Sequence, residues 1–340
     1  MPRIPRSRTG FVLAAAYGGL TLAAAACGGS GTASPTSPGT VTSTPAPTTP
    51  DAWAVEGTVV TTVGRVPVAG VAVKPEFAEG VLTDAQGRFR LSGPSHPGPS
   101  TFAVRLTAPG HVDREIWMTW RRGTRTVSLD IVAETAPFSL TFYREMARDG
   151  YESSRTLEQL MVWRTAPSFY VRTVDEDGRA LETAIVSTIT NTIRGAVADL
   201  TGGRLSVAAL ETGRTERRER SGWINVNVVR KTEDDVCGSA FVGASPGEIT
   251  LLYGGCGCGN GRISSEIVAH EVGHALGFFH TSDRRSLMYP FASGRCPSAT
   301  LTAADRHHSA IAYSRPRGNR DPDRDPQTMP LAFPRIRVVN

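Results

Sequence analysis

Between residues 53 and 134, apolar and polar residues alternate in short β-branched runs that Gly, Pro and Asp interrupt. Such runs between turn signals predict strands, and their spacing predicts an antiparallel β-sandwich. The expected strands are 55–60, 68–73, 87–91, 102–106 and 126–131. A tight hairpin is expected at 84–87, with glycine at a positive φ. The side chains expected in the core are Val71, Val73, Phe89 and Leu91.

From residue 137 onward, helical periods are mixed with strand-like runs. Six apolar residues recur at helical spacing and predict one long amphipathic helix. They are Leu181, Ile185, Ile189, Ile193, Val197 and Leu200. Further strands are expected at 168–174, 204–210, 223–229, 239–242 and 249–253, and helices at 264–276 and 302–313. This order of elements predicts an α+β unit over residues 137–316, long enough to have its own core.

The helix expected at 264–276, with Ser264 or Ser265 as N-cap, carries candidate chemistry. His270 and His274 are four positions apart, so a helix places both imidazoles on one face, within reach of one metal ion.

Gly277 can end that helix at a positive φ and redirect the chain, so that His280 supplies a third ligand. Glu271 lies beside the ligand face and is the candidate general base. Three protein ligands that leave a position for water are typical of a catalytic zinc site. Imidazole also suits copper, nickel, cobalt and iron, but the adjacent glutamate favours Zn²⁺ as the cofactor.

The segment 286–290 reads Ser-Leu-Met-Tyr-Pro. With the histidine motif before it, this segment resembles the metzincin zinc endopeptidases, most like the matrixin branch. The resemblance implies a mixed twisted sheet, an active-site helix, a Met-turn and a C-terminal helix, with Met288 as an apolar floor beneath the imidazoles. A loop methionine that fills a core gap is the alternative interpretation of Met288. The resemblance also implies that the strand at 239–242 pairs with extended substrate.

The first unit has a resemblance of its own. Segments 67–73 and 83–89 resemble the carboxypeptidase regulatory-like domain. Members of that family are usually accessory modules. We therefore expect an all-β sandwich over residues 53–134 and assign no chemistry to it.

The N-terminus is typical of an exported chain. Basic residues precede an apolar stretch, which predicts a signal peptide at residues 1–26. Cys27 follows three alanines in a segment that resembles a bacterial lipoprotein processing site, so it is the candidate for lipidation and membrane anchoring; simple secretion is the alternative. Residues 27–50 are rich in Gly, Ser, Thr and Pro and predict a disordered linker. We expect an exported protein, either a bacterial cell-envelope lipoprotein or a secreted one.

The other cysteines, Cys237, Cys256, Cys258 and Cys296, all lie in the second unit. An even number in an oxidising compartment predicts two disulfide bonds. A bond between Cys256 and Cys258 is sterically awkward, so each should pair with Cys237 or Cys296, in an order that stays open. A second metal site is the alternative, although zinc-binding cysteine pairs usually have two intervening residues.

Charge argues against nucleic acid as a partner. The formal charge is +5, but residues 1–26 contribute three arginines and no acids, and residues 315–340 contribute six arginines against three aspartates. The remaining chain has a formal charge of −1 and offers no basic footprint. We also expect a disordered tail over 317–340 and a monomer.

These features predict a zinc metalloendopeptidase that hydrolyses extracytoplasmic proteins or peptides through a metal-activated water. The alternative is an adhesive or binding surface lipoprotein with a vestigial zinc site. The presence of all three histidines and of Glu271 argues against that alternative. His307 and His308, on the last expected helix, are expected to face solvent and not to bind metal.

Overall fold

The computed structural model describes residues 53–93, 101–119, 123–215, 220–230, 236–253, 263–290, 301–330 and 333–339. All of them belong to one compact unit, Asp51–Asn340. The expected signal peptide, the linker and Cys27 lie outside the described residues. No helix in the described part of the chain has the length and apolar character needed to cross a bilayer.

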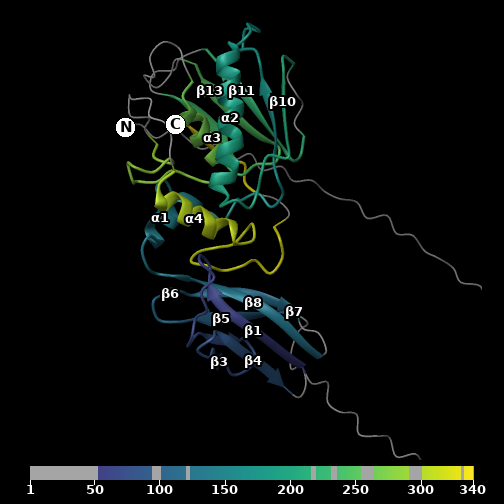
Figure 1. Ribbon diagram of the computed structural model, residues 1–340, viewed down its shortest axis with the longest axis vertical. Coiled ribbons are helices and arrows are strands. Elements are labelled where there is room, and N and C mark those ends of the chain that lie inside the picture. The colour runs from purple at the N-terminus through teal and green to yellow at the C-terminus, as the bar shows by residue number, and fades with distance from the viewer. Residues whose placement is uncertain are drawn as a thin grey trace, which may run out of the picture. The chain divides into compact units, whose positions relative to one another are not determined.

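Between residues 53 and 133 the chain forms two four-stranded sheets, drawn in purple and blue in Figure 1. One has the order β4 (Arg88–Gly93), β1 (Trp53–Thr61), β8 (Gly123–Ala133) and β6 (His111–Val112). The other has the order β3 (Val81–Leu82), β2 (Ala72–Pro75), β5 (Thr101–Thr107) and β7 (Arg114–Thr119). Side chains from both sheets share one apolar core, which contains all four expected residues, Val71, Val73, Phe89 and Leu91.

This region departs from the expected arrangement in three ways. β1 and β8 pair in parallel, so the strands are not all antiparallel. The strand expected at 68–73 begins only at Ala72, because Gly70 has a φ of 72° and the Val71 N–H donates to the Thr83 hydroxyl. Strands β3, β6 and β7 were not expected; the first two have only two residues each, and the charged first residues of β7 obscure its alternation of buried and exposed positions.

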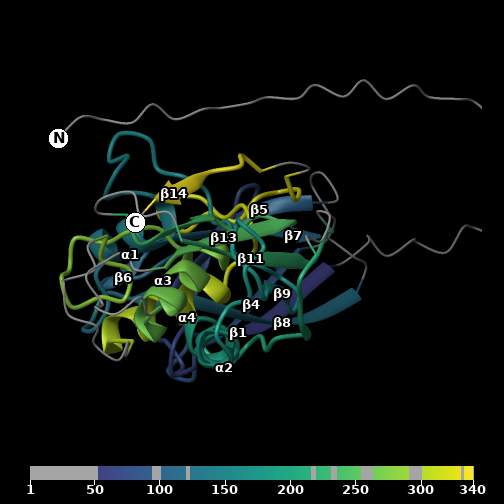
Figure 2. The ribbon, with the colours of Figure 1, turned by 90° about the horizontal axis from the view of Figure 1, so that it is seen from above.

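The remaining strands form one six-stranded sheet with helices beside it (Figures 1 and 2). The order is β10 (Ala209–Gly213), β9 (Ser168–Arg172), β11 (Trp223–Val229), β13 (Gly247–Leu252), β12 (Gly238–Phe241) and β14 (Arg337–Val339). The helices are α1 (Leu140–Arg148), α2 (Thr183–Leu200), α3 (Ser265–Ala275) and α4 (Ala303–Tyr313). The first four strands in this order are parallel, and β12 is antiparallel to β13, so the sheet is mixed.

Helix α3 lies in the interior of this region. It packs against α2 and against strands β12 and β13. The apolar stripe expected on α2 is buried and belongs to the same core as the sheet residues Val226 and Ile249. Helix α1 was not expected, and β10 begins at Ala209, later than the expected residue 204. The helix that carries the histidine motif is thus enclosed by packed elements.

The expected disordered tail at 317–340 is wrong for the residues that the structure describes there. Asn319 and Asp323 are buried, and the segment ends in β14. Backbone hydrogen bonds of 2.9 Å join Asp323 and Asp325 to Glu115 of β7. A charged composition suggests solvated, disordered chain, but here the charges have partners within the fold.

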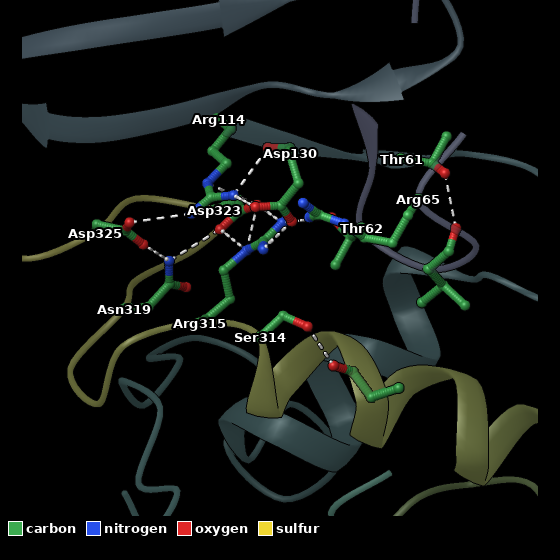
Figure 3. Close-up of polar contacts among 12 residues, drawn as sticks. Thr61, Thr62, Arg65, Arg114, Asp130, Ser314, Arg315, Asn319, Asp323 and Asp325 are labelled. Carbon is green, nitrogen blue, oxygen red and sulfur yellow. Dashed lines mark hydrogen bonds and ion pairs between the residues drawn. The ribbon is translucent and has the colours of Figure 1, made fainter. Parts of the chain in front are cut away.

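Figure 3 shows these partners. Arg315 is fully buried, and its guanidinium donates to Asp130 at 2.6 Å and to Asp323 at 2.8 Å. Arg114 forms ion pairs with Asp130 and Asp325. We call these five residues the charge cluster. It joins β7 and β8 to the segment after α4, so the second unit does not end at residue 316 as expected.

Ionisation of the charge cluster depends on its arginines. Burial opposes ionisation of Asp130, but Arg315 and Arg114 outweigh burial and hold the pKa of Asp130 below its ordinary value. The Thr62 hydroxyl donates to the same carboxylate at 2.6 Å. The cluster therefore remains charged in a largely buried position, where loss of one partner would leave a buried charge without compensation.

Candidate metal centre

Helix α3 presents the histidine motif from within the core. The Ser264 hydroxyl caps its N-terminus and accepts from the Ile267 N–H at 3.2 Å. His270 and His274 are both buried. They occupy positions four apart on one continuous helix, so the helical placement expected from their spacing is confirmed.

The helix ends at a glycine, as expected. Gly277 has a φ of 110°, and the N–H groups of Gly277 and Phe278 donate to carbonyls in the last turn of α3 at 2.9 and 3.0 Å. This pair of bonds is a Schellman motif. A Cβ at position 277 would lie 2.8 Å from backbone atoms of Met161. Glycine is therefore required for both conformation and space, and the turn directs the chain to His280.

The protein holds one nitrogen of each helical imidazole. Nδ1 of His270 lies 2.6 Å from the Leu287 carbonyl oxygen, and Nδ1 of His274 lies 2.8 Å from the Phe278 carbonyl oxygen. A carbonyl oxygen only accepts hydrogen bonds, so each Nδ1 carries the proton. Each Nε2 therefore presents a lone pair, which is the form that binds a metal.

His280 is oriented by a carboxylate. Its Nδ1 lies 2.7 Å from Oε1 of Glu152, which lies in the loop after α1. Its Nε2 is buried and has no hydrogen-bond partner among the described residues. Carboxylates commonly orient metal-binding histidines in this way.

The three rings each bring one nitrogen to a common point. These atoms all lie within 4.8 Å of one another, and the Nε2 atoms of His270 and His274 are 2.9 Å apart. Burial, reinforced by the neighbouring histidines, lowers the pKa of His270 to about 3 and also lowers that of His274, so both rings are neutral. Facing lone pairs at this distance repel unless a cation lies between them. Three imidazoles so placed fit a tetrahedral zinc, whose bonds to nitrogen are about 2.0–2.1 Å.

Glu271 is fully buried, and its carboxylate lies against β12. A Cβ at Gly238, the first residue of β12, would lie 2.7 Å from Oε1 of Glu271. Glycine at this position therefore leaves the room that the carboxylate occupies. The candidate base lies between its own helix and the strand that is expected to pair with substrate.

Met288 is fully buried and lies against α3. A Cβ at Gly273, between the two helical histidines in sequence, would lie 2.5 Å from the Met288 sulfur. Asp305 of α4 holds this turn, since its carboxylate accepts from the Ser286 hydroxyl at 2.6 Å and from the Leu287 N–H at 3.2 Å. We call His270, His274 and His280 the histidine site; the turn with Met288 supports it from one side.

Three residues that surround the histidine site and Glu271 were not expected from the sequence. They are Glu152, Gly238 and Asp305. Asp305 had a local signal, because Thr302 and Asp305 form a capping box at the start of α4. Glu152 had no such signal, since it lies 128 residues from the histidine that it orients.

The expectation that His308 faces solvent is wrong. The side chain is buried, its Nε2 accepts from the Ser139 N–H at 2.9 Å, and its Nδ1 lies 2.7 Å from the Ala304 carbonyl oxygen. It joins α4 to the N-terminus of α1 and lies apart from the histidine site.

Cys237 is buried just before β12. Cys256, Cys258 and Cys296 lie outside the described residues. The two expected disulfide bonds therefore stay a prediction.

Residues 223–313 match the family model of the matrixins. The matched stretch extends from β11 to the end of α4, and it includes the histidine site, Glu271 and Met288. Stromelysin-3 from Xenopus laevis is 44% identical over 52 residues, which are 15% of this chain and 11% of that protein. These matches support a matrixin-like metalloprotease unit in this part of the chain.

The chain thus covers only 11% of the length of that relative. Among solved structures, two chains of type II cohesin–X-dockerin complexes from Acetivibrio cellulolyticus align with 26% and 24% of this chain and with 66% and 58% of their own. Their identities are 20% and 22%, and both TM-scores are 0.20, too low for a shared fold to follow.

Proposed function

We propose that this chain is a zinc-dependent endopeptidase that hydrolyses peptide bonds of extracytoplasmic proteins. The supporting observation is the pair of neutral imidazoles whose Nε2 atoms face each other at 2.9 Å, with a third ring nitrogen within 4.8 Å. All three Nδ1 atoms already have acceptors on the protein. A water molecule has only two hydrogens for three lone pairs, whereas one divalent cation satisfies all of them.

When bound there, zinc supplies the Lewis acidity that polarises a substrate carbonyl and lowers the pKa of water toward about 7. Glu271 takes the proton of the attacking water and delivers it to the leaving amine nitrogen. The carbonyl oxygens of Leu287 and Phe278 hold the two helical imidazoles in the required tautomer. Met288 fills the space beside α3 with an apolar side chain.

The proposed setting is outside the cytoplasm, and it is supported by the sequence alone. It comprises a signal peptide at residues 1–26, a lipid on Cys27 and two disulfide bonds among the four later cysteines. The two sheets between residues 53 and 133 are proposed to be an accessory module of the carboxypeptidase regulatory-like type. The proposed enzyme acts as a monomer.

Removal of the base tests the proposal. We expect the full chain to cleave casein, a chelator to abolish cleavage and zinc to restore it. Glu271→Gln should keep about one zinc per chain and lose at least about 100-fold in rate, the scale of general-base loss. Glu266→Gln, a matched change in the first turn of the same helix, should cleave casein as the parent does.

Two outcomes would count against the proposal. A Glu271→Gln chain that cleaves as fast as the parent would contradict the assigned base. A zinc-loaded parent that cleaves no member of a diverse peptide library would favour a binding protein with a vestigial site.

A further inference from the structure

The strand that borders the candidate base has both of its edges occupied. On one edge β12 pairs with β13, and on the other it pairs with β14. β14, drawn in yellow in Figure 2, lies antiparallel to β12 in the register Phe241↔Arg337, Ala240↔Val338 and Ser239↔Val339. The Val242 N–H donates to the Ile336 carbonyl oxygen at 2.8 Å and extends the pairing. Without the segment 333–339, β12 would be an edge strand among the strands that the structure describes.

The outer edge of β12 leads toward the catalytic carboxylate. A peptide in the register of β14 runs from Phe241 toward Ser239, in the direction of Gly238. Gly238 is the residue whose missing Cβ makes room for the Glu271 carboxylate. An extended peptide on this edge is therefore directed toward the group proposed to activate water. Edge strands bind peptides through main-chain hydrogen bonds and select them through alternate side chains.

The side chains of the segment 333–339 alternate between two sets, and one set is apolar. Ile336 and Val338 pack, with Phe333, against the small buried cluster of Met161, Val242 and Phe279. Phe279 directly precedes His280, so this apolar surface adjoins the histidine site along the chain.

The other set of alternate side chains is basic. The guanidinium groups of Arg335 and Arg337 lie over the Phe241 ring, 4.4 and 4.8 Å from its centroid. Arg337 also pairs with Glu248 of β13 at 2.6 Å. Cation–π contact and an ion pair on the same face favour a positive side chain at this position of a bound peptide.

We propose that the edge of β12 that is expected to pair with substrate prefers extended segments in which basic residues alternate with branched apolar ones, and that the chain itself supplies one such segment. The chain's own segment 333–339 is an intramolecular ligand of this site and competes there with substrate. Binding of the segment to β12 does not depend on the proposed function. The consequence, that the segment restrains peptide cleavage, rests on it.

Binding of a peptide to the full chain tests the site without requiring catalysis. The probe is a fluorescein-labelled peptide with the sequence of residues 333–339. In the Ile336→Asp, Val338→Asp double variant the intramolecular segment loses its apolar contacts, so the labelled peptide should bind about tenfold or more tightly than to the parent, as expected when a tethered competitor is released. Equal binding to both chains, or binding to neither, would overturn the proposal.

A charge exchange tests the basic preference in a second way. A probe with glutamate in place of its residue Arg337 should bind the double variant several-fold more weakly than the original probe, and adding Glu248→Arg to that variant should reverse the order. An unchanged order would overturn the basic preference. This comparison does not depend on how well the double variant folds relative to the parent, because both probes meet the same chain.

Cleavage separates the inference from the proposed function. The double variant should cleave a short peptide with a KM lower than that of the parent and an unchanged kcat, because only competition at the strand has been removed. Tight probe binding without cleavage in either chain supports the strand site and counts against the endopeptidase. Equal KM values in two active chains overturn the inference and leave the endopeptidase standing.

Discussion

Two groups of buried polar side chains in this chain differ in how their polar atoms are satisfied. In the charge cluster, Arg315 donates to Asp130 and Asp323 at 2.6 and 2.8 Å, so opposite charges pair within the fold. In the histidine site, each ring is held through Nδ1 by another described residue, and the remaining nitrogens are directed at one another. In the first group, each buried charge faces an opposite charge, and Thr62 and Asn319 add hydrogen bonds. The second consists of acceptors alone, and it becomes favourable only with a cation.

Burial and a shifted pKa do not by themselves separate these two groups. The pKa values of Asp130 and His270 are both lowered strongly, but for different reasons. Arginines overcome burial at Asp130, whereas burial itself lowers the pKa of His270. The chemistry of the facing atoms, and not the size of a pKa shift, therefore identifies the functional group.

The largest effect, on zinc content and peptide cleavage, is expected from removal of one imidazole of the histidine site. His274→Ala should lower the bound zinc from about one per chain to near zero at micromolar zinc and abolish peptide cleavage, since only two protein ligands remain. Zinc content by atomic absorption after gel filtration checks this. His307→Ala, a partly exposed histidine outside the site, should keep its zinc; loss of zinc in both variants would contradict the assignment.

A large effect on stability, and none on zinc stoichiometry, is expected in the charge cluster. Arg315→Met leaves Asp130 and Asp323 short of a buried cation and should lower the free energy of unfolding by about 3–5 kcal/mol, the usual cost of breaking a buried pair. Urea denaturation of the chelator-treated chain measures this. Arg179→Met, which removes the exposed pair with Asp177, should change stability by about 1 kcal/mol or less. Similar losses in the two variants would show that the buried pairs of Arg315 stabilise the fold no more than an exposed pair does.

The smallest effect, on zinc affinity, is expected from a change of Glu152, whose carboxylate orients His280. Glu152→Gln keeps an oxygen near Nδ1 of His280 but removes the charge, so zinc affinity should fall about tenfold, the lower end for such partners. Competition with a fluorescent zinc chelator measures the dissociation constant. The exposed change Glu79→Gln should leave it unaltered, and an unchanged affinity in Glu152→Gln would limit Glu152 to a packing role.

Local spacing explains which parts of the metal centre could be predicted. His270, His274 and the glycine turn are separated by a few residues, so helical geometry alone places them. The stripe of α2 and the alternating strands β1, β4 and β5 follow from the same short periods. These periods do not determine which strands pair, as the unexpected parallel pairing of β1 with β8 shows.

Long-range pairing explains what was missed. Glu152 and the charge cluster each join residues more than a hundred positions apart, and no local pattern announces such a contact. The tail at 317–340 was expected to be disordered because a segment rich in charged residues usually remains solvated. Arg315 instead donates to both Asp323 and Asp130 in the interior, a contact that only the folded arrangement reveals.

Zinc K-edge X-ray absorption on the zinc-loaded full chain would identify the atoms that bind the metal. We expect four nitrogen or oxygen ligands at about 2.0–2.1 Å, with the outer-shell scattering of three imidazoles and no sulfur. Sulfur at about 2.3 Å would show that cysteines bind the metal instead. Failure to retain any zinc would contradict a shared site on the three histidines.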